Sequence, residues 1–274
     1  MNKIIWSVYY SATGTTKKIV NRVADKLADE LCAERKSYDF TRPLNRKKTI
    51  SFNHNDIVVF GSPIYAGRIP NLMLKYISGI EGNGALVIPI VLFGNRAYDD
   101  GLLELRDILE SNNFYTIAAA AFVGQHSFSK EIAKGRPDAG DLKIADKLSF
   151  QISEKISALK SGVEIKPIMV PGVPSPYRGY FKPQKGNSSS IDIRKVKPHT
   201  LSLCDDCKLC VEVCPMGVID FNDPTLINGI CIKCCACIQV CTLSAKYFND
   251  ADFLYHVRDL ELKLTKRASV ELFL

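Results

Sequence analysis

Through its first 160 residues the chain alternates short apolar runs with amphipathic stretches. Four runs have the length and composition of buried strands: residues 4–9, 56–60, 85–93 and 114–123. The stretches between them repeat apolar residues at helical spacing and predict helices, one through Ile19, Val20, Val23, Leu27 and Leu31 and others at 71–80, 102–112 and 138–160. Strands that alternate with helices predict a parallel, doubly wound α/β sheet that is covered on both faces.

The loops at one edge of this predicted sheet form the candidate ligand site. In doubly wound sheets, ligands bind across the carboxyl ends of the strands. The loops that follow Tyr9, Phe60 and Phe93 all fall on that edge. Glycines at 61, 67 and 94 let the backbone of two of these loops approach a ligand closely.

The first of these loops is rich in hydroxyl side chains. Residues 11–16 read Ser-Ala-Thr-Gly-Thr-Thr and lie between a predicted strand and a predicted helix. Backbone N–H groups and the positive end of the helix dipole favour a phosphate at such a place. No Gly-Lys-Ser/Thr sequence follows, so this is not a Walker loop. The hydroxyls suit a phosphate monoester held without metal or lysine, and the alternative interpretation is a polar helix cap.

This loop resembles the phosphate loop of flavodoxins through the pattern Ser11-x-Thr13-Gly14-x-Thr16. The resemblance covers about residues 1–162 and implies a flavodoxin-like, five-stranded sheet that binds FMN. The cofactor-binding residues that it implies are Ser11, Ala12, Thr13, Gly14, Thr15 and Thr16 around the phosphate, Pro63, Ile64, Tyr65 and Ala66 on one side of the ring, and Gly94, Asn95, Tyr98 and Asp99 on the other. We expect FMN and not FAD because the sequence offers no separate adenosine site.

Three side chains near this edge have competing interpretations. Aromatic faces pack well on a flavin, which gives a role to Tyr65 or Tyr98, and the alternative for either is a rim aromatic. His126 follows the last predicted strand, where a histidine could donate to the flavin or shuttle a proton to a substrate. The alternative is a solvated loop histidine, and His126 is the one catalytic candidate.

Eight of the ten cysteines form two runs of the same spacing. The first run is Cys204, Cys207, Cys210 and Cys214, and the second, 27 residues later, is Cys231, Cys234, Cys237 and Cys241. Thiolates are soft ligands that select iron–sulfur clusters, zinc or Cu(I). Zinc sites generally use paired C-x-x-C sequences, so the doubled C-x-x-C-x-x-C-x-x-x-C pattern favours clusters over zinc sites or a disulfide knot.

About residues 197–253 resemble the bacterial-type ferredoxins that hold two [4Fe–4S] clusters. In that family the fourth cysteine of each run binds the other cluster. The resemblance therefore implies two sets of ligands, which are Cys204, Cys207, Cys210 and Cys241 for one cluster and Cys231, Cys234, Cys237 and Cys214 for the second. Pro215 closes the first run as the family pattern expects, whereas Thr242 closes the second, which leaves the local turn open but removes no ligand. Cys235 is interpreted as an unligated neighbour.

Residues 163–197 separate the two predicted domains. Six of the thirteen prolines lie between residues 163 and 200, in a basic stretch that cannot form a regular helix or a central strand. We expect a linker in which Tyr177, Tyr180 and Phe181 pack against a domain. Residues 198–274 then form an α+β ferredoxin-like domain that ends in a helix.

The formal net charge of +7 is weak evidence for nucleic-acid binding. Anionic clusters and a flavin phosphate would offset most of it, and the excess also suits a docking face for an acidic redox partner. No run of 18 apolar residues predicts a transmembrane helix, and the N-terminus lacks a secretory signal. We expect a cytoplasmic protein that binds neither nucleic acid nor membrane.

Because it combines both resemblances, the chain is similar to the fused flavodoxin–ferredoxin proteins of anaerobic microbes. Clusters pass single electrons, whereas a flavin holds one or two and reacts with organic molecules. We expect an electron-transfer flavoprotein that relays electrons between two [4Fe–4S] clusters and FMN, with a redox protein or a small-molecule acceptor as partner. The alternatives are an FMN-dependent reductase of a small organic substrate, fed by its own ferredoxin domain, and a redox sensor or partner-binding module.

Overall fold

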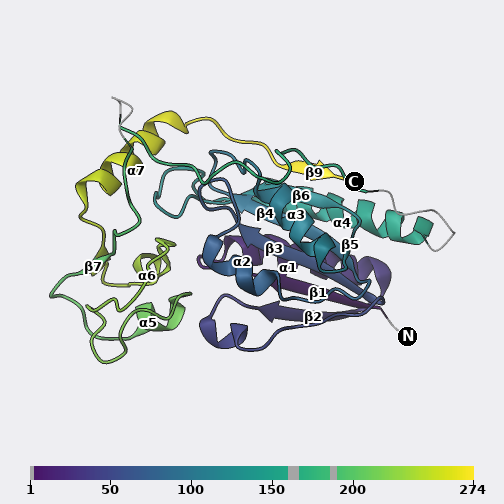
Figure 1. The fold of residues 1–274 in the computed structure, drawn as a ribbon, viewed down its shortest axis with the longest axis horizontal. Helices are drawn as coiled ribbons and strands as arrows, with labels where there is room; N and C mark the ends of the chain where they lie inside the picture. Colours follow the sequence, from purple (N-terminus) through teal and green to yellow (C-terminus); the bar gives the residue numbers. More distant parts are fainter. Residues whose placement is uncertain (1–2, 160–166, 186–189) are drawn as a thin grey trace.

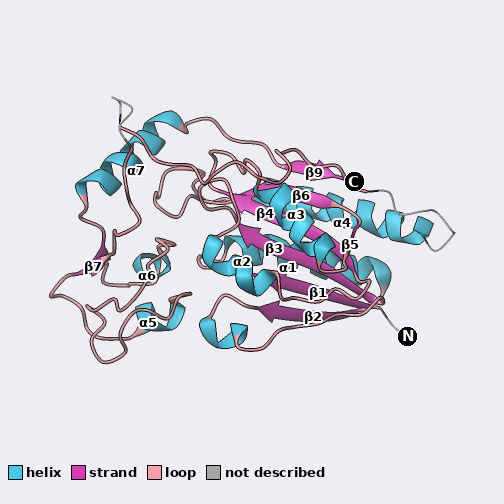
Figure 2. Ribbon diagram, viewed as in Figure 1, coloured by secondary structure: helices cyan, strands magenta, loops and turns pink. Residues whose placement is uncertain are grey.

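The large sheet of the computed structural model runs in the order β2-β1-β3-β4-β6-β9, with β5 paired to β4 (Figure 2). The structure describes residues 3–159, 167–185 and 190–274. The strands are β1 (Ile4–Tyr9), β2 (Glu34–Asp39), β3 (Asp56–Pro63), β4 (Leu86–Phe93), β5 (Tyr115–Thr116), β6 (Ala119–Val123) and β9 (Glu271–Phe273). From β2 to β6 the strands are parallel, in the flavodoxin-like order. The predicted doubly wound sheet of five parallel strands is confirmed.

Each face of the sheet has its own hydrophobic core. Helices α1 (Thr15–Leu31) and α4 (Ala139–Leu159) cover one face, and α2 (Asn71–Ile77) and α3 (Gly101–Ser111) cover the other (Figure 1). Successive residues of a strand point to opposite faces, so both cores draw on the same strands. This burial on both sides explains why β4 is apolar throughout and why β3 is apolar from Ile57 to Phe60.

Three local features depart from the sequence prediction. Strand β2 was not predicted, because its sequence Glu-Arg-Lys-Ser-Tyr-Asp is polar and partly exposed at the sheet edge. The strand expected at 114–123 is interrupted, and β5 and β6 take its place. Helix α2 ends at Ile77, earlier than expected, and Lys160 of the last predicted helix lies outside the described residues.

The cysteine-bearing residues 198–250, which we call the cysteine lobe, lie beyond the carboxyl ends of the parallel strands (Figure 1). The elements of the lobe are β7 (His199–Thr200), α5 (Leu209–Val213), α6 (Ala236–Gln239) and β8 (Lys246–Tyr247). The residues that precede α5 and α6, Lys208 and Cys235, both adopt left-handed backbone angles, with φ of 63° and 61°. The repeated cysteine spacing is therefore accompanied by a repeated backbone conformation before each of the two helices.

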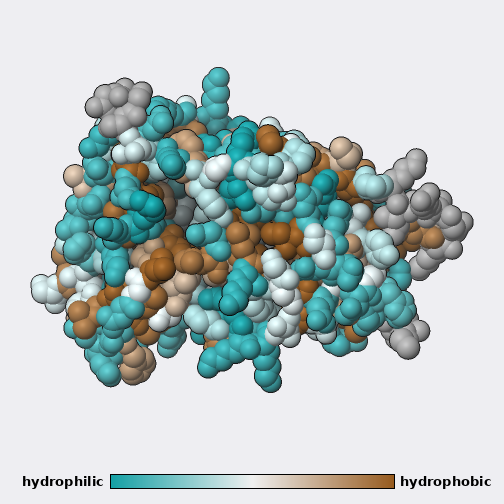
Figure 3. Space-filling model, in the orientation of Figure 1, coloured by the Kyte–Doolittle hydropathy of each residue, from teal (hydrophilic) through white to brown (hydrophobic). Residues whose placement is uncertain are grey.

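The cysteine lobe packs directly against the sheet domain. The guanidinium of Arg46, from the 3-10 helix η1 (Pro43–Arg46), donates to the carbonyl of Pro215 at 2.5 Å. Met216 and Ile232 pack on the core that lies beneath α2 and α3. Hydrophobic surface gathers between the lobe and the sheet domain on the face shown in Figure 3.

After the lobe, the chain returns to the sheet. Helix α7 (Ala251–Lys263) begins with Asp250 as its cap, since the Asp250 carboxylate accepts from the N–H of Phe253 at 2.8 Å. Strand β9 then pairs antiparallel with β6. The closing helix was expected within the ferredoxin-like domain, but the return of the chain to the sheet was not predicted.

Hydrogen bonds hold the described part of the linker against the sheet domain. The Tyr177 hydroxyl donates to the carboxylate of Asp107, and the Tyr180 hydroxyl donates to the carbonyl of Ile69, both at 2.8 Å. The expected packing of these tyrosines is confirmed, while linker residues 163–166 and 186–189 lie outside the described residues. Within the described ranges, no helix combines the length and apolar character needed to cross a membrane.

Candidate functional site

A cleft of about 910 Å³ opens at the carboxyl edge of the large sheet. Its volume is near the upper end of the range of about 300–1,000 Å³ that is usual for ligand pockets. All three predicted loops contribute to its lining. The predicted cofactor-binding residues that line it are Ser11, Ala12, Thr13, Thr15, Thr16, Pro63, Ile64, Tyr65, Ala66 and Gly94.

The loop between β1 and α1 has the form of an anion site. The Ser11 hydroxyl accepts the N–H of Lys17 at 3.0 Å, which ties the loop to the helix. Gly14 takes a φ of 87°, a left-handed conformation that glycine adopts without steric cost. Among the described residues, the backbone N–H groups of residues 13–16 have no acceptor. Free N–H groups at the positive end of a helix are what a phosphate requires.

The loop after β3 approaches the loop after β4 so closely that a glycine is needed between them. A Cβ on Gly67 would lie 2.0 Å from a carboxylate oxygen of Asp99, and the φ of Gly67 is 82°. Asp99 also pairs with Arg96 and does not line the cleft. Tyr65 does line the cleft, and burial raises the pKa of its hydroxyl well above the usual value. Tyr65 is therefore neutral at physiological pH.

The side chains of Asn95 and Tyr98, two of the predicted flavin-binding residues, hydrogen-bond the C-terminal segment. The Asn95 amide donates to two backbone carbonyls between residues 264 and 266, at 2.8 and 3.1 Å, and accepts from the N–H of Ala268. The Tyr98 hydroxyl donates to the carboxylate of Glu271 at 2.8 Å. Neither side chain lines the cleft. A loop motif carries no signal for this arrangement, because the partners lie in the C-terminal segment, 169 to 173 residues away in the sequence.

His126 lies in the cleft beside the loop after β4. A Cβ on Gly94 would lie 2.5 Å from Cδ2 of the His126 ring, so glycine is required at position 94. Nδ1 of His126 accepts the N–H of Phe128 at 3.2 Å. Burial, followed by the charges of His256 and Arg96, lowers the pKa of His126 to about 4. His126 is therefore neutral at pH 7, with its proton on Nε2.

The far side of the cleft is formed by residues to which the sequence assigned no role in ligand binding. The linker contributes Tyr180 and Phe181, and α7 contributes His256 and Leu260. These residues belong to no motif and come from segments distant in the sequence. The sequence predicted only that Tyr180 and Phe181 pack against a domain and that the chain ends in a helix.

The eight cysteines divide between two small cavities in the lobe. The outer cavity is lined by Cys204, Cys207, Cys210 and Cys241, and the inner cavity by Cys214, Cys231, Cys234 and Cys237. This division is the one expected from the ferredoxin pattern, in which each run lends its fourth cysteine to the other site. That these thiols ligate clusters stays a prediction.

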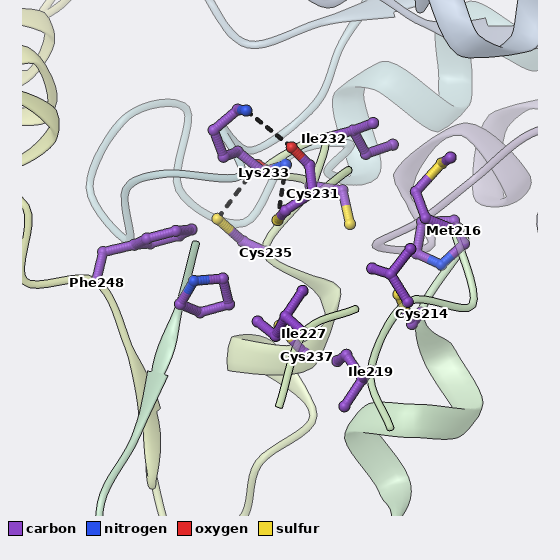
Figure 4. Close-up of a pocket in the computed structure, with 14 residues that line it drawn as sticks. Cys214, Met216, Ile219, Ile227, Cys231, Ile232, Lys233, Cys235, Cys237 and Phe248 are labelled. Atoms are coloured by element: carbon purple, nitrogen blue, oxygen red, sulfur yellow. Dashed lines mark hydrogen bonds between the residues drawn. The ribbon is translucent and has the colours of Figure 1, made fainter. Parts of the chain in front are cut away.

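The inner cavity is apolar and buried (Figure 4). The Sγ of Cys231 accepts the N–H of Lys233 at 3.4 Å, and the Cys235 thiol donates to the Lys233 carbonyl at 3.6 Å. Burial raises the pKa of Cys234 and of Cys237 to about 12. Ligation requires thiolates, so metal uptake at this cavity would release protons.

The donor set fits an iron–sulfur cluster in both cavities. The outer cavity offers four thiols, and the inner cavity offers the four predicted ligands and Cys235. Each cavity contains an N–H···S contact, from Lys233 to Cys231 in the inner one and from Ala245 to Cys241 in the outer one. Four cysteines are the usual ligands of a [4Fe–4S] cluster. Within the described ranges, no three His, Cys, Asp or Glu side chains are arranged around a single metal-ion position.

The inner cavity and the cleft share a wall. Cys231, Ile232 and Lys233 line both of them, and Figure 4 shows these residues along one side of the inner cavity. None of the residues that line the outer cavity also lines the cleft. The inner cavity is thus the one next to the candidate flavin site.

Two family models match the sequence. The flavodoxin domain model matches residues 7–83, and the 4Fe-4S binding domain model matches residues 199–220. A search of curated proteins finds no match. The order of the two domains is that of a fused flavodoxin–ferredoxin protein. A flavodoxin domain indicates FMN and a 4Fe-4S binding domain indicates a 4Fe–4S cluster, so the chain is an iron–sulfur flavoprotein of electron transfer.

Several solved structures are similar to the sheet domain. A flavodoxin from the domain Archaea is 13% identical, with a TM-score of 0.40, over 56% of this chain and 99% of that one. A flavodoxin of Streptococcus pneumonia TIGR4 is 18% identical, with a TM-score of 0.37, over 57% and 99%. The rubredoxin oxygen:oxidoreductase of Desulfovibrio gigas is 18% identical, with a TM-score of 0.40, over 58% of this chain and 37% of that one.

Proposed function

We propose that this chain relays electrons between a redox partner protein, two [4Fe–4S] clusters and FMN. The observation that carries the proposal is the wall of Cys231, Ile232 and Lys233, which the inner cavity and the cleft share. Clusters exchange single electrons, and a flavin accepts one or two. The chain brings two kinds of redox site to adjacent positions in one molecule.

The two cavities have different roles in this proposal. The inner cavity, with Cys234 and Cys237 buried, faces the flavin site. The outer cavity lies nearer the surface, with Cys207 exposed and Leu203 and Leu243 exposed beside it. The outer cavity is therefore the place where a partner protein exchanges electrons, and the inner one connects that place to the cleft.

Local charge at the outer cavity favours a partner with a basic face. Asp205 and Asp206 are exposed in the loop between Cys204 and Cys207, and Asp223 is exposed nearby. Complementary charge speeds association and orients the encounter. The acidic partner expected from the net charge of the whole chain does not suit this rim, because like charges would meet there.

Replacing a phosphate-loop hydroxyl tests the flavin site. Thr13→Leu removes a hydroxyl from the cleft and fills the space of the phosphate. Losing one hydrogen bond to a charged group costs about 1.5–3 kcal/mol, so FMN should bind roughly 10–100-fold more weakly. Titration of flavin-depleted protein with FMN, followed by flavin fluorescence, measures this.

The control is Thr49→Leu, at an exposed position outside the cleft. Wild-type FMN affinity in Thr13→Leu would exclude this loop as the phosphate site. Metal analysis of anaerobically purified protein should at the same time give about eight irons per chain, from two four-iron clusters. Stoichiometric zinc would exclude the clusters.

A further inference from the structure

The cleft has a roof that the flavin loops do not provide. We define the cleft roof as Tyr180 and Phe181 of the linker with His256 and Leu260 of α7. The N–H of Phe181 donates to the carbonyl of Ala66 at 2.8 Å, and the Arg96 guanidinium lies 4.5 Å from the centre of its ring. The roof is thus fixed in place over the loops that follow β3 and β4.

Two neutral histidines supply polar groups to this part of the cleft, His256 from the roof and His126 from the loop that follows β6. His256 is buried, and burial lowers its pKa. Among the described residues, neither His256 nor Nε2 of His126 has a hydrogen-bond partner. Since Nδ1 of His126 is used by the N–H of Phe128, its Nε2–H is a free donor. Two rings that lie in one cleft therefore have hydrogen-bonding capacity that the protein does not use.

The roof itself carries no charged side chain, and the arginines of the cleft are paired with carboxylates, which favours a neutral ligand beneath the roof. Arg96 pairs with Asp99, and Arg194 pairs with Asp192. The Lys233 ammonium donates to backbone carbonyls of Cys231 and Arg194. Lys182, the remaining basic residue of the lining, is exposed to solvent.

We propose that the cleft roof and His126 form a second compartment of the cleft, which binds a small, neutral, planar quinone. Phe181 and Leu260 supply apolar surface for the ring, and His126 and His256 supply N–H donors for the carbonyl oxygens. The compartment rests on the proposed function, since FMN would occupy the part of the cleft that the sheet loops line. Reduction of the quinone to a hydroquinone takes up two electrons, delivered singly by the reduced partner protein, and two protons from solvent.

Duroquinone binding to the oxidised holoprotein tests this compartment. All four ring positions of duroquinone carry methyl groups, so it does not add to thiols, and calorimetric titration reports its affinity without turnover. Phe181→Ala and His256→Leu should each weaken binding about tenfold, and His256→Gln should restore much of the affinity because it keeps a donor. The matched control is Arg258→Leu on the same helix, with a side chain that is 71% exposed.

FMN content measured on each variant separates this proposal from the relay. The proposal is supported if Phe181→Ala and His256→Leu bind duroquinone more weakly while their FMN and iron contents are unchanged. Arg258→Leu should keep the wild-type affinity. No duroquinone binding to the wild type would overturn the compartment, as would wild-type affinity in both Phe181→Ala and His256→Leu. Neither result would contradict the proposed electron relay. The relay is contradicted instead if FMN or iron is missing from the wild-type protein.

Discussion

The two cysteine cavities have the same sequence spacing but different surroundings. The inner cavity is walled by apolar residues and borders the flavin cleft. The outer cavity has an exposed cysteine, Cys207, and an acidic rim. Ligand spacing therefore specifies what each site can bind, whereas the surroundings decide which redox partner it meets.

Residues next to the cysteines, not the cysteines themselves, determine which cavity is inner. Pro215 and Met216 follow Cys214, and Ile232 follows Cys231, and all three lie where the lobe meets the sheet domain. The nearby cations also differ, because the buried Lys246 lies beside the outer thiols and the half-buried Lys233 beside the inner ones. Nearby charge and exposure tune cluster potentials, so the two sites are expected to differ in potential.

Removing one cysteine ligand from each cavity should have the largest effect and should distinguish the two cavities. Cys231→Ala and Cys207→Ala should each lower iron from about eight to about four per chain. With a protein donor, flavin reduction should then stop in Cys231→Ala, because the site next to the cleft is lost, and should be slow in Cys207→Ala. Dithionite reduces flavins directly and should do so in both variants. Stopped-flow absorbance measures both rates, and identical behaviour of the two variants would contradict the inner and outer assignment.

Charge reversal at the outer rim should have a moderate effect. Asp205→Lys/Asp206→Lys should slow association with cytochrome c, a basic one-electron carrier, by about tenfold at low salt, because steering is lost. The difference should shrink as salt rises. The matched control is Asp29→Lys/Glu30→Lys at the far end of α1, where both residues are exposed. An equal effect in the control would place the docking site elsewhere.

Substitution of Cys235 should have the smallest effect. Cys235 occupies the position of Lys208 in the other run, with nearly the same left-handed backbone, so this position is not one that the repeat uses for a ligand. Cys235→Ser should keep about eight irons per chain and the wild-type visible spectrum. Loss of half the iron would show that Cys235, rather than a neighbouring thiol, holds the inner cluster.

The parts of this molecule that sequence could predict are those with local signals. Strands buried on both faces, such as β4, are apolar throughout, and ligand spacing is written within eleven residues of each cysteine run. Strand β2 was not predicted because it lies at the edge of the sheet, where a strand can be polar along its whole length. The role of Asn95 was missed because its partners lie in the C-terminal segment, and a long-range pairing leaves no periodic trace in the sequence.

The antiparallel addition of β9 to β6 has a consequence for the movement of the cysteine lobe. The linker anchors the lobe to the sheet domain at one end, and β9 anchors it at the other. A segment that is attached at both ends cannot move away from the sheet domain as a domain on a single flexible linker does. In the proposed relay, electron transfer between the lobe and the sheet domain is therefore intramolecular, and its rate should not change when the protein is diluted.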